Sequence, residues 1–299
     1  MRKWEKELSE FAALGRPLWR LAGTSISRLN RIVFPPACLG CGVDLDEADL
    51  PANVGLLEVR DRAISVKTSA GSFNQYWFQN WQSTNWCEAC WRQAAAKSVD
   101  RCRRCGALLF RANPLRGSCQ HCHGEEFHFD QAFAVNGYHG LFRELVTRMK
   151  NQKDDHLAIH LGNLLGSELC LNGWHEFDLI LPVPQPWLRR LKRGFQATEI
   201  LAERVAQLTG IPQSSKVIRA TRNSAKQGTL SVTARQSNVR NAFGLYSAQA
   251  VSKVKGQRIL VIDDVMTTGA TLSEIARMLK RQQAAAVSVA VVARGGGNN

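Results

Sequence analysis

The sequence predicts an α/β fold in which helices flank a parallel β-sheet, with a small cysteine-rich module before it. Three observations predict this fold. Eight of the nine cysteines form four C-x-x-C pairs, and all eight precede residue 123. Beyond them, apolar segments alternate with amphipathic segments, which is typical of a parallel sheet covered on both faces. One apolar segment also runs directly into two aspartates and a loop of Thr and Gly.

Length and composition limit the class of protein. A chain of 299 residues is long enough for two domains at about 150 residues each. Hydrophobic residues make up 44% and charged residues 21%, as in folded soluble proteins. No stretch approaches the roughly 18 uncharged apolar residues of a membrane span, and residues 1–20 lack the apolar core of a signal peptide. We therefore expect a cytoplasmic protein without a membrane span, of unknown oligomeric state.

Residues 1–32 form a basic segment that precedes the cysteines. Leu8 and Phe11 have helical spacing, but Gly15 and Pro17 interrupt the pattern. Proline and glycine both disfavour a continuous helix. We interpret this segment as a basic N-terminal helix or arm.

The four C-x-x-C pairs, CLGC, CEAC, CRRC and CQHC, indicate metal sites. Two thiolates at this spacing can bind one tetrahedral ion, and two pairs complete its shell. Disulfides are disfavoured in a reducing compartment, and a redox C-x-x-C would occur once rather than four times. A closed four-thiolate shell leaves no open position, so we predict two structural Zn²⁺ sites. The predicted ligands are Cys38, Cys41, Cys87, Cys90, Cys102, Cys105, Cys119 and Cys122.

The sequence leaves the grouping of these pairs open. Sequential grouping and an interleaved cross-brace are both possible, and the gap of 13 residues between Cys105 and Cys119, usual for a zinc ribbon, favours the sequential one. A polar, Trp-rich insertion, residues 44–86, interrupts the first two pairs. Its aromatic side chains could stack on single-stranded nucleic acid or pack on the zinc module, and we favour packing.

The first half of the sheet region begins after Cys122. Residues 129–138, FDQAFAVNGY, predict a strand. Residues 141–150 and 156–171 carry apolar side chains at helical spacing and predict two helices. Residues 177–184 form a short apolar strand that ends in prolines, which cannot donate to a sheet ladder.

The second half continues the alternation. Residues 198–210 predict a helix that ends at a glycine, and residues 216–221 predict a short strand. Residues 258–265 predict a buried strand, since residues 259–262 are apolar without interruption up to the aspartates. A helix over residues 271–282 and a last buried strand over residues 286–294 complete the pattern.

The segment over residues 258–272, RILVIDDVMTTGATL, is the strongest functional signal. At the start of a helix, backbone N–H groups and the helix dipole favour an anion, and glycine permits close approach of the backbone. Asp263 and Asp264 would repel that anion but can accept hydrogen bonds from a neighbouring ribose diol. We therefore predict a sugar phosphate site rather than a mere aspartate-rich helix cap. The expected anion-binding residues are Thr267, Thr268, Gly269, Ala270 and Thr271.

Two other phosphate motifs are absent from the sequence. It contains no G-x-x-x-x-G-K-[ST] and no G-x-G-x-x-G, which excludes a Walker P-loop and a dinucleotide fingerprint.

ILVIDDVMTTGAT resembles the phosphoribosyl pyrophosphate (PRPP) motif of type I phosphoribosyltransferases. With LPVP at 181–184, KRGF and its following helix at 192–202, the segment 219–243 and the C-x-x-C pairs, the chain resembles the ComF/ComFC/GntX family. That family joins a double zinc ribbon to a phosphoribosyltransferase domain and is linked to natural competence and imported DNA. The resemblance covers about residues 33–294. It departs at Gln196-Ala197, where family members usually carry Asn-Gln, and in the long insertion.

The resemblance implies a double zinc ribbon over residues 33–125 and a phosphoribosyltransferase-fold domain over residues 126–299. It implies that Asp263 and Asp264 bind the ribose hydroxyls of PRPP, that the loop after them binds its 5′-phosphate, and that Mg²⁺ accompanies the pyrophosphate. Arg193 joins the two aspartates as an expected catalytic residue. The other residues expected to contact the phosphates or the closing loop are Arg189, Arg190, Lys192 and Arg222.

The charge distribution agrees with anionic ligands. Of the net charge of +14, most comes from residues 188–258, which hold 14 Lys and Arg against two Asp and Glu. Guanidinium groups bind phosphate oxygens bidentately, and the excess also suits a nucleic-acid backbone. We expect a phosphoribosyltransferase of unknown acceptor, with single-stranded DNA or competence-machinery proteins as partners. The alternatives are a non-catalytic single-strand binder that retains the pocket, and a salvage enzyme unconnected with DNA.

Overall fold

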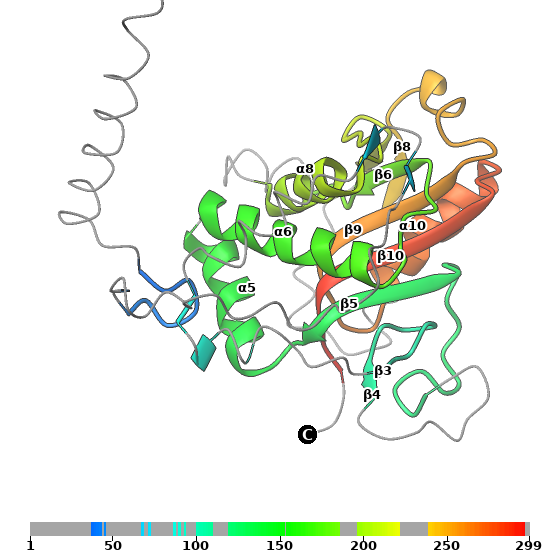
Figure 1. Cartoon of the computed structure of the whole chain (residues 1–299). Coiled ribbons are helices and arrows are strands. Elements are labelled where there is room, and N and C mark those ends of the chain that lie inside the picture. The colour runs from blue at the N-terminus through cyan, green and yellow to red at the C-terminus, as the bar shows by residue number, and fades with distance from the viewer. Residues whose placement is uncertain are drawn as a thin grey trace, which may run out of the picture.

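The computed structural model of the chain describes all nine cysteines and most of the sheet region, whose helices and strands are drawn in Figure 1. The predicted N-terminal segment 1–32 and nearly all of the insertion 44–86 lie outside the described residues. The described residues are 37–43, 45, 67–68, 71–72, 86–87, 89–90, 93, 100–109, 119–152, 154–185, 196–221 and 239–296.

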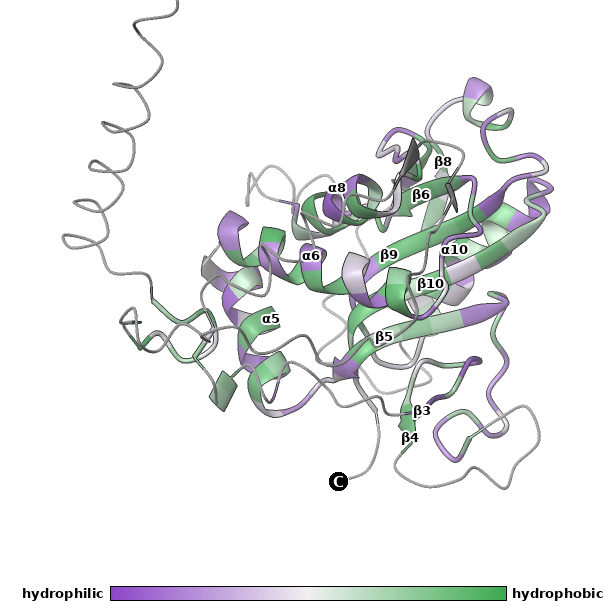
Figure 2. Cartoon of the chain, in the orientation of Figure 1, coloured by the Kyte–Doolittle hydropathy of each residue, from purple (hydrophilic) through white to green (hydrophobic). Residues whose placement is uncertain are grey.

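A parallel sheet forms the centre of the fold, as predicted, and it contains four strands. Its order is β5 (Gln131–Gly137), β10 (Ala286–Arg294), β9 (Arg258–Met266) and β6 (Leu179–Pro182). The strands are apolar on both faces because both faces are covered, and Figure 2 shows the hydrophobic colouring of β9 and β10.

Helices cover both faces of this sheet (Figure 1). On one face lie α5 (Gly140–Gln152), α6 (Asp155–Leu171) and α8 (Ala197–Thr209), and on the other lies α10 (Ala270–Arg281). Alternate residues of β9 serve the two cores: Leu260 and Ile262 face the first, and Ile259 and Val261 the second. The predicted fold class is therefore confirmed.

Small residues and caps explain how the helices fit. The α6 N-cap, Asp154, accepts a hydrogen bond from the Leu157 N–H at 2.9 Å, as capping aspartates do. Gly210 ends α8 with a φ of 73°, the left-handed C-terminal geometry that glycine favours. A Cβ on Gly162 would lie 2.8 Å from the Cβ of Arg204, so glycine allows α6 and α8 to approach closely.

Short strands flank the main sheet. The predicted strand over 216–221 forms β7 (Ile218–Ala220), which pairs antiparallel with β8 (Phe243–Leu245) in a sheet of its own. A 3₁₀ turn, η2 (Ala248–Ala250), leads towards β9. Antiparallel pairs also form between β3 (Asp100–Arg101) and β4 (Leu108–Leu109), and between β1 (Lys67–Thr68) and β2 (Gly71–Ser72). None of the described helices has the length and apolar character needed to cross a bilayer.

Candidate functional site

The candidate site begins in the C-terminal half of β9, at Asp263 and Asp264. Asp263 is half-buried and Asp264 is buried, and the Asp264 N–H donates a hydrogen bond to Asp263 Oδ1 at 2.9 Å. Ile262, the residue before them, pairs with Pro182 at the end of β6. The two carboxyl groups therefore lie at the carboxyl edge of the parallel sheet, where open α/β sheets bind ligands.

Lys150 is a member of this site that the sequence analysis missed. Its Nζ lies 2.8 Å from Asp264 Oδ1, and its side chain is 35% exposed. Lys150 belongs to the last turn of α5, where a cation is favourable for any helix, so its sequence position gives no functional signal. Only the packing of α5 against the sheet brings this ammonium group to the aspartates.

Burial and neighbouring charges shift the pKa of Asp263 and of Lys150. Burial raises the pKa of Asp263 to about 8, the charge of Asp264 adds to this rise, and Lys150 opposes it. Burial lowers the pKa of Lys150, but the charge and hydrogen bond of Asp264 outweigh burial and raise it overall. The ligand-free site thus favours a protonated Asp263 beside the Lys150–Asp264 ion pair.

The loop after β9 adds backbone donors. Gly269 has a φ of 78° and is the N-cap of α10, and its carbonyl accepts from the Ser273 N–H at 2.8 Å. A Cβ on Gly269 would lie 3.0 Å from Cε1 of Phe127, so both conformation and space require glycine. The first turn of α10 carries no acidic residue. The partial positive charge of the helix start is therefore available to an anion.

The structure brings together some of the expected ligand-contacting residues. Asp263, Asp264 and the loop residues Thr267, Thr268, Gly269, Ala270 and Thr271 follow one another around the end of β9. The expected basic residues lie outside the described part of the chain. These are Arg189, Arg190, Lys192, Arg193 and Arg222.

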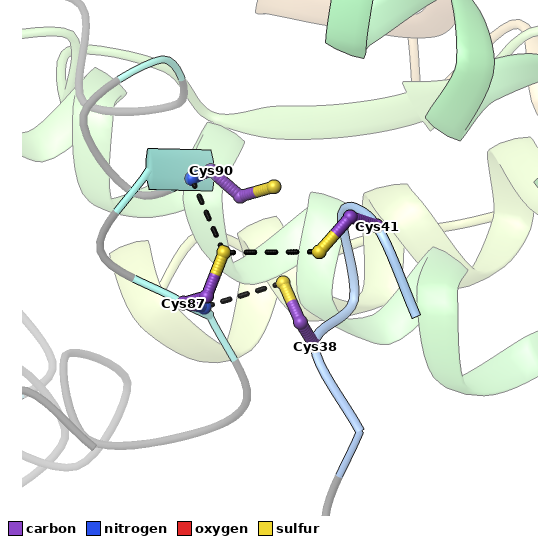
Figure 3. A group of neighbouring side chains, drawn as sticks. All are labelled: Cys38, Cys41, Cys87 and Cys90. Atoms are coloured by element: carbon purple, nitrogen blue, oxygen red, sulfur yellow. Dashed lines mark hydrogen bonds between the residues drawn. The ribbon is translucent and has the colours of Figure 1, made fainter. Parts of the chain in front are cut away.

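Four cysteines form a first group of thiols (Figure 3). The sulfur atoms of Cys38, Cys41, Cys87 and Cys90 all lie within 4.8 Å of one another, and those of Cys41 and Cys87 are 3.8 Å apart. Burial raises the pKa of Cys38, but N–H groups of Cys87, Cys41 and Gly40 outweigh it and lower this pKa to about 7. Cys38 is therefore favoured as a thiolate, which is the form that binds metal, whereas burial raises the pKa of Cys90.

The second group contains Cys102, Cys105, Cys119 and Cys122, and all four are buried. Their sulfur atoms also lie within 4.8 Å of one another. Burial and the charges of neighbouring thiolates raise the pKa of Cys105, and burial chiefly raises that of Cys122 to about 11. A divalent cation would remove this repulsion, so the donor set fits a tetrahedral ion such as Zn²⁺. The grouping is the sequential one.

All nine cysteines lie among the described residues, and none of them forms a disulfide there. The closest sulfur contact in the second group, between Cys105 and Cys119, is 3.6 Å, well beyond the roughly 2.05 Å of a disulfide bond. Two closed sets of four thiols can thus each hold a metal ion.

Comparisons with known proteins agree with this architecture. Residues 191–298 match the phosphoribosyl transferase domain family. The DNA utilization protein YhgH of Salmonella typhimurium is 32% identical over 207 residues, which cover 68% of this chain and 87% of that protein. Competence protein F of Haemophilus influenzae is 28% identical over 199 residues, covering 65% and 84%.

Among solved structures, a purine phosphoribosyltransferase from Pyrococcus horikoshii Ot3 is 20% identical. The similar region covers 45% of this chain and 70% of that chain, with a TM-score of 0.28. The sheet order, the two cysteine groups and the identity to the curated relatives converge on one assignment. This chain belongs to the ComF/YhgH family of phosphoribosyltransferase-fold competence and DNA utilisation proteins.

Proposed function

We propose that this protein binds PRPP with Mg²⁺ at the carboxyl end of β9 and transfers the ribose 5-phosphate group to an acceptor. The observation that carries the proposal is the direct succession of the Asp263–Asp264 pair, the 267–271 loop and the start of α10. This order places hydrogen-bond acceptors, the carboxylates, beside N–H groups that can donate to an anion. A ribose phosphate needs both, for its hydroxyls and for its phosphate.

Each part of the site has a role in this proposal. Carboxylate oxygens of Asp263 and Asp264 accept hydrogen bonds from the ribose 2′- and 3′-hydroxyls, and the loop N–H groups donate to the 5′-phosphate. Lys150 offsets the charge of Asp264, so an anionic ligand meets less repulsion. Carboxylates are the hard oxygen ligands that Mg²⁺ prefers, and when bound, this ion would supply charge that stabilises the leaving pyrophosphate.

The transfer breaks the bond between ribose C1 and the pyrophosphate oxygen and forms a bond from C1 to a nucleophilic atom of the acceptor. Pyrophosphate leaves with the bonding electrons, and the acceptor loses a proton to solvent. Positive charge develops on the ribose ring as the first bond breaks, so the negative Asp263–Asp264 pair stabilises it. Arg189, Arg190, Lys192, Arg193 and Arg222 are proposed to bind the pyrophosphate.

A role in DNA use is the second part of the proposal. The names of the relatives, DNA utilization protein and competence protein, support it, as does the basic stretch over residues 188–258. The phosphates of single-stranded DNA would bind to these Lys and Arg side chains. A protein that binds DNA without catalysis, with the β9 pocket sensing a nucleotide, is the alternative.

Two measurements separate enzyme from binder. Release of pyrophosphate from PRPP should be measured with candidate bases and single-stranded DNA as acceptors, in the wild type and in Asp263→Asn/Asp264→Asn. Release that requires the aspartates supports the enzyme. DNA affinity that falls steeply with salt, is unchanged in the double variant and comes without any release supports the binder.

A further inference from the structure

Arg294 connects the second cysteine group to the candidate site. It is the last residue of β10 and is 8% exposed. Its Nε donates to the carbonyl of Cys105 at 3.0 Å, and its Nη1 donates to the carbonyl of Met266 at 3.1 Å. Nη1 also contacts the carbonyls of Thr267 and Gly295. One guanidinium therefore bridges a metal-ligand residue and the first peptide groups of the anion loop.

The bridged carbonyls set the direction of the loop's N–H groups. A trans peptide is planar, so its C=O and N–H point in opposite directions. When Arg294 binds the carbonyls of Met266 and Thr267, the N–H groups of Thr267 and Thr268 must point away from the guanidinium. The Gly295 N–H also donates to the Met266 carbonyl at 2.8 Å, so these peptides are held from more than one side.

A second contact runs through Phe127. Its ring packs against the buried cysteines of the second group and stacks on Phe129 with ring centroids 4.7 Å apart. The same ring lies against Gly269, at the position that a Cβ would need. The next residue, His128, donates its N–H to Ser273 Oγ in the first turn of α10 at 3.0 Å.

The second group is itself anchored to the sheet. The carbonyl of Arg103, between two ligand residues, accepts from the Ala132 N–H of β5 at 2.8 Å. Arg101 donates to the Ala134 carbonyl at 2.9 Å and pairs with Glu168 of α6 at 3.2 Å. The cysteine group is thus fixed on one side and supports the anion loop on the other.

We propose that metal binding by the second cysteine group holds the 267–271 loop in its anion-binding conformation, with Arg294 as the positioning residue. Four thiolates around a divalent ion carry net negative charge, which balances the buried cation beside them. Without the ion, the carbonyl of Cys105 is no longer fixed by its own ligated side chain, and the guanidinium loses this anchor. The identity of the anion rests on the proposed function, but the coupling itself does not.

The first cysteine group provides a matched comparison. Arg148 of α5 donates to the carbonyls of Leu39 and Gly40 at 2.8 and 3.1 Å, so the described contacts of this group lead to α5 rather than to the loop. Loss of one ligand there should leave the loop unchanged.

The test is hydrogen exchange of the full chain, with zinc content measured by elemental analysis. We expect Cys119→Ser to lose one zinc ion and to increase about tenfold or more the exchange of the Gly295 and Ser273 amides, which donate to the carbonyls of Met266 and Gly269 at the two ends of the loop, since a hydrogen bond from a charged donor contributes that much. Cys41→Ser should also lose one ion but should leave these amides protected. Equal exchange in the two variants would overturn the proposal.

Arg294 variants cover the case in which Cys119→Ser does not fold. Arg294→Met should retain both zinc ions, expose the same amides and weaken the binding of ribose 5-phosphate. Arg294→Lys keeps the charge but loses the planar guanidinium. Its amide exchange rates and its affinity for ribose 5-phosphate should therefore lie between those of Arg294→Met and the wild type. Wild-type protection in Arg294→Met would refute the inference. If the wild type binds no PRPP while the exchange results hold, the proposed function fails and the coupling stands.

Discussion

Lys150 Nζ lies 2.8 Å from Asp264 Oδ1, which connects the end of α5 to the carboxyl end of β9. The same helix contacts the first cysteine group through Arg148. The acid pair of the candidate site is therefore not an isolated strand end, because a packed helix supplies its counter-charge.

Replacing Lys150 with Met should lower stability and weaken PRPP binding. Because the lysine is 35% exposed, solvent screens the pair, and we expect a loss of about 1 kcal/mol in the free energy of unfolding. Urea unfolding and calorimetry measure the two effects, and Lys150→Arg, which keeps the charge, should retain most of both. In the Asp264→Asn background, Lys150→Met should change the free energy of unfolding very little. If the two substitutions had fully additive effects on this free energy, the ion pair would be contradicted.

Asp263 should make the ligand-free protein less stable as pH rises. Its pKa is about 8 in the fold against an ordinary value of 3.8, so the folded state binds more protons than the unfolded state between these values. Stability therefore falls as pH increases from about 4 to 8 and then levels off. In urea unfolding at several pH values, Asp263→Asn should remove this fall, and an unchanged pH profile in that variant would count against the raised pKa.

The same pKa predicts proton release on ligand binding. A ribose hydroxyl donates to an ionised carboxylate, so binding at pH 7 should displace a proton from Asp263. Calorimetry in buffers of different ionisation enthalpy measures the number of protons released. We expect the wild type to release protons on binding at pH 7 and Asp263→Asn to release none. Net proton uptake by the wild type would contradict the raised pKa.

Gly269→Ala tests the loop conformation. At a φ of 78° an alanine costs about 1–2 kcal/mol, and here its Cβ also meets Phe127. Gly173→Ala is the control, since Gly173 has a φ of 75° but no atom within 4 Å of the added Cβ. Thermal unfolding should show a larger loss for Gly269→Ala, and only that variant should lose PRPP binding. Equal losses in stability would mean that the Phe127 contact has no effect.

The cysteine grouping predicts how metal is lost. Native mass spectrometry should find two zinc ions per chain. Cys38→Ser/Cys87→Ser changes one group and should lose one ion, whereas Cys38→Ser/Cys102→Ser changes both groups and should lose two. An interleaved arrangement would exchange these results.

Local patterns predicted most of the fold. The mainly apolar segments 258–265 and 286–294 became β9 and β10 because buried parallel strands require apolar side chains on both faces. Gly210 ends α8 as expected. The strand β8 was missed, since three residues carry too little pattern to predict a strand, and the pairing of β7 with β8 depends on contacts that no local pattern encodes.

Only those residues of the candidate site that are contiguous in the sequence were predicted. Asp263, Asp264 and the loop are contiguous, so their spacing alone indicates a strand end and an anion-binding turn. Lys150 and Arg294 reach the site from other elements through packing, and each looks like an ordinary terminal residue in the sequence. The roles of Arg189, Arg190, Lys192, Arg193 and Arg222 stay predictions.

Calorimetric titration of PRPP with Mg²⁺ into the full chain is the most direct test of the central claim. The wild type should bind with a dissociation constant below about 1 mM, corresponding to roughly 4 kcal/mol, and Asp263→Asn/Asp264→Asn should show no heat at the same concentrations while unfolding cooperatively. Absence of heat in the wild type, or equal affinity in the double variant, would contradict the assignment of a PRPP site to the end of β9.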